Sequence, residues 1–143
     1  MLRRPRRLRS SKAIRNLVRE TKLQVEDLIY PLFIVDGENI KREISSMEGV
    51  YHFSVDMLED EIKELTDLGI EHVLLFGVPD DEKKDCCASE AFNPEGGVQR
   101  AVRKIKEINP EMGVICDVCM CEYTNHGHCG ILTESGYVHN DKT

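Results

Sequence analysis

Three continuous apolar runs, separated by two amphipathic stretches, constrain the fold of this chain more than any other feature. The apolar runs cover residues 28–35, 73–78 and 114–120, and each has the length of a strand that is buried on both faces. Between them, residues 56–68 and 98–108 carry apolar side chains at helical spacing. This order of strand, helix, strand, helix, strand predicts an α/β fold with a parallel sheet built from βαβ units.

Local signals predict where some of these elements begin and end. The first helix is expected to end at Gly69, because glycine commonly follows a helix C-terminus. The second helix is expected to begin with Asn93 as its N-cap and Pro94 as its first residue. Residues 38–53 give mixed signals and are predicted to form a loop with short extended pieces. Pro31 favours an edge or a bulge, because proline cannot donate to a strand ladder.

Three strands and two helices fall short of a complete open sheet or a closed barrel. The sequence ends at residues 140–143, where Asn140 or Asp141 suits the cap of a further helix. We therefore predict that these 143 residues are the first part of a longer α/β protein. The first and third strands would each leave an unpaired edge, so we expect self-association if this part folds alone.

The charge distribution divides the chain into a basic arm, residues 1–25, and an acidic body, residues 26–143. Residues 1–20 hold eight basic side chains and one acid, whereas the remaining 123 residues hold 11 basic and 25 acidic side chains. The first 20 residues contain no aromatic side chain for base stacking but do contain interleaved apolar ones. We expect the arm to contact another subunit; a nucleic-acid contact and a solvated tail are the alternatives.

The composition also bears on the membrane and on the cellular compartment. The longest apolar run has eight residues, far fewer than the roughly 18 that a membrane-spanning helix needs. Charged residues interrupt the N-terminus where a secretory signal would have its apolar segment. We expect a cytoplasmic protein with no membrane partner.

The six cysteines point to a metal site near the third strand. All lie within residues 86–129 of a chain without an export signal, which argues against a disulfide framework. Strand alternation would place Asp117, Cys119 and Cys121 on one side of the strand's C-terminal end, where parallel α/β folds bind ligands. The following loop brings back Cys129. Three thiolates favour a soft-metal site, with Zn²⁺ as the typical ion.

The spacing leaves alternatives open. Three thiolates without a fourth protein ligand are typical of a catalytic site that stays open to water or substrate. His126 or His128 would instead complete a structural site. Unligated thiols packed as small apolar groups, and redox thiols, are further interpretations. Cys116 is predicted to point to the opposite face of the strand, into the core.

Several segments together resemble the porphobilinogen synthase family, the 5-aminolevulinate dehydratases. They are the run Asp117–Gly130, Asn109-Pro-Glu-Met112, and the opening Arg3-Arg-Pro-Arg-Arg-Leu-Arg9 with Leu17-Val-Arg-Glu-Thr21. The family divides into zinc enzymes with three cysteines and relatives with carboxylates in their place. Cys119, Cys121 and Cys129 match the zinc type. The resemblance implies a (β/α)8 TIM barrel and an N-terminal arm that wraps a neighbouring subunit, usually within an octamer.

The resemblance also implies an activity. The family joins two molecules of 5-aminolevulinate into porphobilinogen on the pathway to haem and other tetrapyrroles. Two lysines form Schiff bases with the substrates, zinc acts as a Lewis acid, and Asp117 matches an active-site aspartate. The two lysines belong to later barrel strands, so none of the nine lysines here takes that role. We therefore expect this chain to be inactive by itself.

Other residues near the motif receive minor roles in this interpretation. His128 matches a residue that joins a second zinc site in some relatives, but we expect it to orient the loop. Glu122 and Tyr123 are expected to support the site. Cys86 and Cys87 are not generally cysteines in the family and are taken as incidental, with a second metal or redox role as the alternative. The rival overall hypothesis is a small zinc-binding interaction module whose arm contacts nucleic acid or protein.

Overall fold

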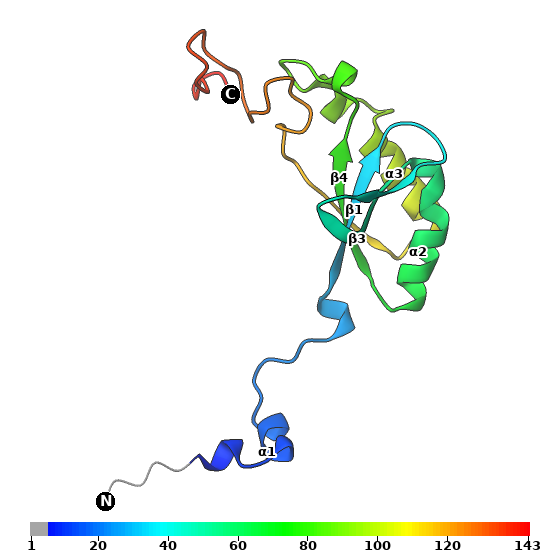
Figure 1. Cartoon of the computed structure of the whole chain (residues 1–143), viewed down its shortest axis with the longest axis vertical. Coiled ribbons are helices and arrows are strands. Elements are labelled where there is room, and N and C mark those ends of the chain that lie inside the picture. The colour runs from blue at the N-terminus through cyan, green and yellow to red at the C-terminus, as the bar shows by residue number, and fades with distance from the viewer. Residues whose placement is uncertain (1–5) are drawn as a thin grey trace, which may run out of the picture.

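A five-stranded sheet with two helices against it dominates the computed structural model, which describes residues 6–143 (Figure 1). The strands are β1 (Ile29–Val35), β2 (Lys41–Ile44), β3 (Met47–Phe53), β4 (His72–Val78) and β5 (Gly113–Cys116). The α-helices are α1 (Lys12–Leu17), α2 (Leu58–Asp67) and α3 (Gly97–Ile108). Short 3-10 helices cover Arg7–Arg9, Val25–Asp27, Val55–Met57, Asp81–Lys83 and Ser89–Phe92.

The strand order β2-β3-β1-β4-β5 confirms the predicted α/β fold and its parallel sheet. β1 pairs in parallel with β4 along its whole length. β3 pairs in parallel with β1, and β5 pairs in parallel with β4. β2 runs antiparallel to β3. The expectation of a loop over residues 38–53 was therefore wrong. Its polar side chains hid the β2–β3 hairpin, because all of β2 except its last residue is exposed and shows no alternation of burial.

β1 lies in the interior of the sheet, so the prediction that the first strand is an edge was also wrong. Pro31 pairs with Leu74 on β4, whereas β3 pairs with β1 only at Phe33 and Ile34. At Pro31, β1 therefore has a neighbouring strand on one side only. A proline without an N–H is tolerated there, even though β1 is a central strand further along. β5 is an edge of the sheet, as expected for the third predicted strand.

The core forms between the sheet and helices α2 and α3. Fully buried apolar side chains from both layers meet there: Leu32, Ile34, Phe53, Leu58, Ile62, Leu65, Val73, Leu75, Ala101, Ile105 and Met112. The periodicity predicted both helices, and Gly69 follows α2 with a positive φ of 77°, as expected at that end. The core therefore holds the sheet and the two helices together as two packed layers. The loops that follow β4 and β5 extend from this support.

The predicted start of α3 was three residues too early. The helix begins at Gly97, and the Asn93 side chain accepts a hydrogen bond from Glu95 N at 3.0 Å. The Asn93 carbonyl in turn accepts a bond from Gly96 N at 2.9 Å. Asn93 and Pro94 therefore form a turn ahead of the helix rather than its cap.

The N-terminal segment extends away from the sheet (Figure 1). Its helix α1 begins after Ser11, whose hydroxyl accepts a hydrogen bond from Ile14 N at 3.2 Å. Leu8 and Leu17 are 62% and 81% exposed, so this segment presents apolar side chains to its surroundings. Arg3 and Arg4 of the predicted arm lie outside the described residues. In residues 6–143 no helix has the length and apolar character needed to cross a membrane.

Candidate metal centre

β5 ends before the predicted site begins. Asp117 N donates to Leu75 O on β4 at 3.1 Å, and the Asp117 carboxylate then accepts a hydrogen bond from Cys119 N at 3.2 Å. This side-chain bond turns the backbone out of the strand direction. The prediction of a strand through residue 120, with alternation aligning the cysteines, was therefore wrong. The prediction of a core position for Cys116 was also wrong, because this last residue of β5 is exposed beside an open cavity.

A tight turn, rather than a strand, brings the cysteines together. The carbonyl of Met120 accepts hydrogen bonds from Tyr123 N at 3.0 Å and Thr124 N at 3.2 Å. The Thr124 hydroxyl lies 3.1 Å from His128 O, within reach of a bond to the returning loop. Cys129 is thereby folded back over Cys121.

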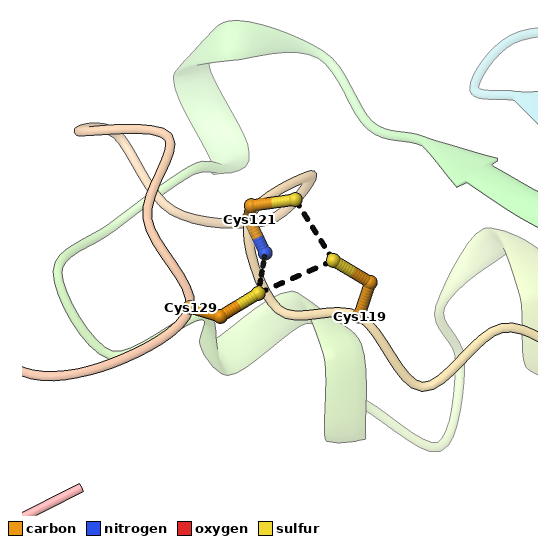
Figure 2. A group of neighbouring side chains, drawn as sticks. All are labelled: Cys119, Cys121 and Cys129. Atoms are coloured by element: carbon orange, nitrogen blue, oxygen red, sulfur yellow. Dashed lines mark hydrogen bonds between the residues drawn. The ribbon is translucent and has the colours of Figure 1, made fainter.

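The three predicted cysteines converge in one cluster (Figure 2). Cys119 Sγ lies 2.8 Å from Cys121 Sγ and 3.2 Å from Cys129 Sγ, and all three sulfurs lie within 4.8 Å of one another. Cys121 N donates to Cys129 Sγ at 3.2 Å. The thiols are free, and sulfur is a donor that zinc and other soft metals prefer. The cluster therefore fits a thiophilic metal ion.

The crowding of the thiols changes their acidity in opposite directions. Hydrogen bonding with Cys121, and then with Cys129, raises the pKa of Cys119 to about 12. The bond from Cys119 lowers the pKa of Cys129, helped by backbone N–H groups at Met120 and Cys121. Of these two thiols, Cys129, which is exposed, is therefore the one that loses its proton more readily.

Asp117 lies at the rim of a cavity of about 380 Å³ beside the cluster. The cavity walls come from α3, from the loop before it, and from the end of β5 with the loop that follows, and they include Phe92, Gln99 and Tyr123. Because Cys119 lines the same cavity, a molecule bound there would meet both a carboxylate and a metal-binding thiol. Asp117 and the cysteines lie close together, as predicted, but a turn rather than a continuing strand places them there.

Tyr123 anchors the metal loop, residues 117–130, to the sheet through a contact that the sequence did not reveal. Its side chain is buried and occupies the space beside Gly77 on β4. A Cβ at Gly77 would lie 2.7 Å from Tyr123 Cζ and closer still to the hydroxyl oxygen. A glycine inside a strand pattern often marks such a close approach, and this was the available signal. Burial raises the pKa of Tyr123 to about 12, so the phenol stays protonated at neutral pH.

The histidines lie next to the cluster without joining it. His126 Nδ1 accepts a hydrogen bond from His128 N at 3.2 Å, and their rings are stacked with centroids 6.0 Å apart. Among the residues that the structure describes, the group suited to a metal consists of the three cysteines. This arrangement favours the open three-thiol site over a site closed by His126 or His128. Glu122, whose pKa is raised by burial and by Asp117, also stays outside the group.

Fold and site together define an α/β protein with a cluster of three thiols, suited to a metal ion, beyond the carboxyl end of a parallel sheet. Residues 2–143 match the family model described as delta-aminolevulinic acid dehydratase. The chain belongs to this family.

Similar proteins cover the whole chain. The delta-aminolevulinic acid dehydratase of Ruminiclostridium josui is 53% identical over 143 residues, all of this chain and 68% of that protein. The Bacillus subtilis enzyme is 50% identical over 140 residues, 98% of this chain and 42% of that protein. A crystal structure of the Toxoplasma gondii enzyme, in complex with the reaction product porphobilinogen, superposes with a TM-score of 0.91 at 39% identity, over 100% of this chain and 41% of that one.

These coverages place the chain within a larger fold. It spans about two-fifths of the length of the Bacillus subtilis and Toxoplasma gondii proteins. The predicted fold class, an N-terminal portion of a TIM barrel preceded by an extended arm, is confirmed by this superposition. The family is metal-dependent in general, and the cysteine cluster provides a place for the metal.

Proposed function

We propose that this chain supplies the metal-binding part of a porphobilinogen synthase, a lyase that condenses two molecules of 5-aminolevulinate. The observation that carries the proposal is the convergence of Cys119, Cys121 and Cys129 beside Asp117, beyond the carboxyl ends of parallel strands. Ligands of α/β barrels bind at that end of the sheet. The solved Toxoplasma gondii relative contains porphobilinogen, which supports the same chemistry here.

Zn²⁺ is the proposed metal, with the three cysteine sulfurs as its protein ligands. When bound, the ion would act as a Lewis acid on a substrate oxygen, because three protein ligands leave a coordination position open. Asp117 would accept a hydrogen bond from, or hold a proton near, a substrate in the adjoining cavity. Tyr123 would hold the loop against β4, so that the sulfurs keep their relative positions.

The remaining parts of the proposal concern the whole protein. The arm, residues 1–25, would dock on a neighbouring subunit through side chains such as Leu8 and Leu17, within an octamer. The cytoplasm suits a protein with free, exposed thiols. Schiff-base lysines would come from outside these 143 residues, and the chain alone would be inactive.

The proposal is tested with the chain loaded with Co²⁺, a paramagnetic stand-in for zinc. We expect added 5-aminolevulinate to show enhanced proton relaxation, because the substrate would approach the metal. Cys119→Ser should lose this enhancement, whereas Cys86→Ser, which removes a thiol outside both the cluster and the cavity beside Asp117, should keep it. Equal relaxation in all three proteins would contradict the proposal. Porphobilinogen formation by the chain alone would contradict its expected inactivity.

A further inference from the structure

A pair of thiols on another loop lines a cavity together with one residue of the three-cysteine cluster. Cys86 and Cys87 are both exposed, and their sulfurs lie 3.4 Å apart. They line a cavity of about 290 Å³ together with Cys129, the most exposed sulfur of the three-cysteine cluster. Two loops that are far apart in the sequence therefore present thiols to one shared space.

Backbone hydrogen bonds tie these two loops together. Asp85 N donates to Tyr123 O at 3.3 Å, and Asn125 N donates to Asp85 O at 3.1 Å. Asp85 and Thr124 thereby form an isolated parallel bridge between the segment before Cys86 and the metal loop. Cys86 thus directly follows Asp85, the residue that attaches this segment to the metal loop.

The Asp85 side chain also fixes the conformation of the pair. Its carboxylate accepts hydrogen bonds from Cys87 N at 2.8 Å, from Ser89 N at 3.0 Å and from the Ser89 hydroxyl. Ala88 completes the turn with a positive φ of 53°. A non-glycine residue in this region costs free energy, and the surrounding hydrogen bonds hold it there. The two sulfurs are consequently presented side by side.

Metal binding explains this arrangement better than a disulfide does. A disulfide between Cys86 and Cys87 would close a small ring whose geometry is far from the usual separation of bonded cysteines. Two adjacent thiols instead offer two soft ligands to one ion, with water completing the coordination. With two protein ligands rather than three, such a site would hold the ion more weakly than the cluster.

We propose that Cys86 and Cys87 form an accessory site for Zn²⁺, from which the ion passes through Cys129 to the three-cysteine centre. On binding, the two thiols release their protons and the ion gains two thiolate ligands. On transfer, the cluster thiols become ligands and release their protons, while Cys86 and Cys87 take up protons again. No oxidation state changes. The transfer step rests on the proposed function of the three-cysteine centre, whereas binding by Cys86 and Cys87 does not.

Metal stoichiometry tests the binding step. The chain is titrated with Co²⁺, and the thiolate-to-cobalt charge-transfer absorption reports each thiolate site. We expect two bound ions in the unmodified chain, one in the Cys86→Ser/Cys87→Ser double variant and one in Cys119→Ser. Cys116→Ser serves as the thiol control and should bind two. If the double variant binds as many ions as the unmodified chain, the accessory site does not exist.

Uptake kinetics test the transfer step. Zn²⁺ is offered from a chelator to the metal-free chain, and occupation of the three-cysteine centre is followed with time. In the double variant we expect uptake to slow, with the final occupancy of the three-cysteine centre unchanged. An unchanged rate would overturn the transfer step. If the unmodified chain binds one ion and Cys119→Ser retains it, the three-cysteine proposal fails while the accessory site stands.

Discussion

Replacing Gly77 with alanine should disturb the metal loop through the sheet. A Cβ at this position of β4 would lie 2.7 Å from Tyr123 Cζ and 3.1 Å from Val98 Cγ2. An ordinary carbon–carbon contact is about 3.5 Å, so Tyr123 Cζ would have to move by about 0.8 Å, and the hydroxyl oxygen, which would lie closer still, would have to move further. Because Tyr123 is buried and follows Cys121 by two residues, the displaced ring would pull on the turn that carries the cysteines.

The cost can be bounded from overpacking in other protein cores. An added methyl group in a well-packed interior costs about 1–3 kcal/mol of unfolding free energy, and we expect Gly77→Ala to fall in this range. If about 1.4 kcal/mol of that strain is relieved by movement of the metal loop away from its binding geometry, the Kd for zinc should rise about tenfold.

Urea unfolding and competitive zinc titration measure the two effects. Tyr123→Leu in the Gly77→Ala background removes the groups that clash, so the double variant should be more stable than the sum of the single changes predicts. The reasoning is refuted if Gly77→Ala leaves both the unfolding free energy and the zinc affinity unchanged. It is also refuted if the two substitutions are additive.

Three further predictions follow from the described contacts. Leu75→Ala, at a fully buried position of β4, should lower the unfolding free energy by about 2–5 kcal/mol, measured by urea denaturation. Asp85→Ala should speed amide hydrogen exchange at Cys87 and Ser89, because their N–H groups donate hydrogen bonds to the Asp85 carboxylate. Unchanged exchange at these two residues would show that the carboxylate does not fix the turn. Burial, followed by the hydrogen bond to Glu61, raises the pKa of Tyr30 to about 12 from 10.0. The phenol is thus harder to ionise in the folded state than in the unfolded state. Its contribution to the unfolding free energy is complete below pH 10 and is lost between pH 10 and 12. The urea midpoint should fall across this interval, and it should fall less steeply in Tyr30→Phe.

The sequence was sufficient to predict the strands and helices whose apolar side chains recur in a regular pattern. β1 and β4 appear as apolar runs, although buried and half-buried residues alternate along β4, so one face is covered more fully than the other. The helix α2 shows its buried side through Ile62 and Leu65. The β2–β3 hairpin had no such signal, because only the last residue of β2 escapes full exposure. Its pairing depends on contacts between strands, which periodicity within one segment does not report.

The candidate site was predicted by residue type but not by geometry. Strand alternation led to Cys119 and Cys121, yet β5 ends at Cys116, and the sulfurs meet through a turn that follows Asp117. A side chain that bonds its own backbone two residues on competes with the strand, and propensity alone does not decide which wins. The attachment of the metal loop to Asp85 is a long-range contact that no local pattern contains.

The central claim is that one zinc ion is held by the sulfurs of Cys119, Cys121 and Cys129, with a coordination position left open. X-ray absorption at the zinc edge tests it most directly, on the Cys86→Ser/Cys87→Ser variant loaded with one equivalent of zinc, so that the cluster alone supplies sulfur. The account predicts three sulfur neighbours at about 2.3 Å and one nitrogen or oxygen neighbour. In the same background, Cys119→Ser should lose this sulfur-bound zinc. A zinc ion with four sulfur neighbours, or with none, would contradict the account.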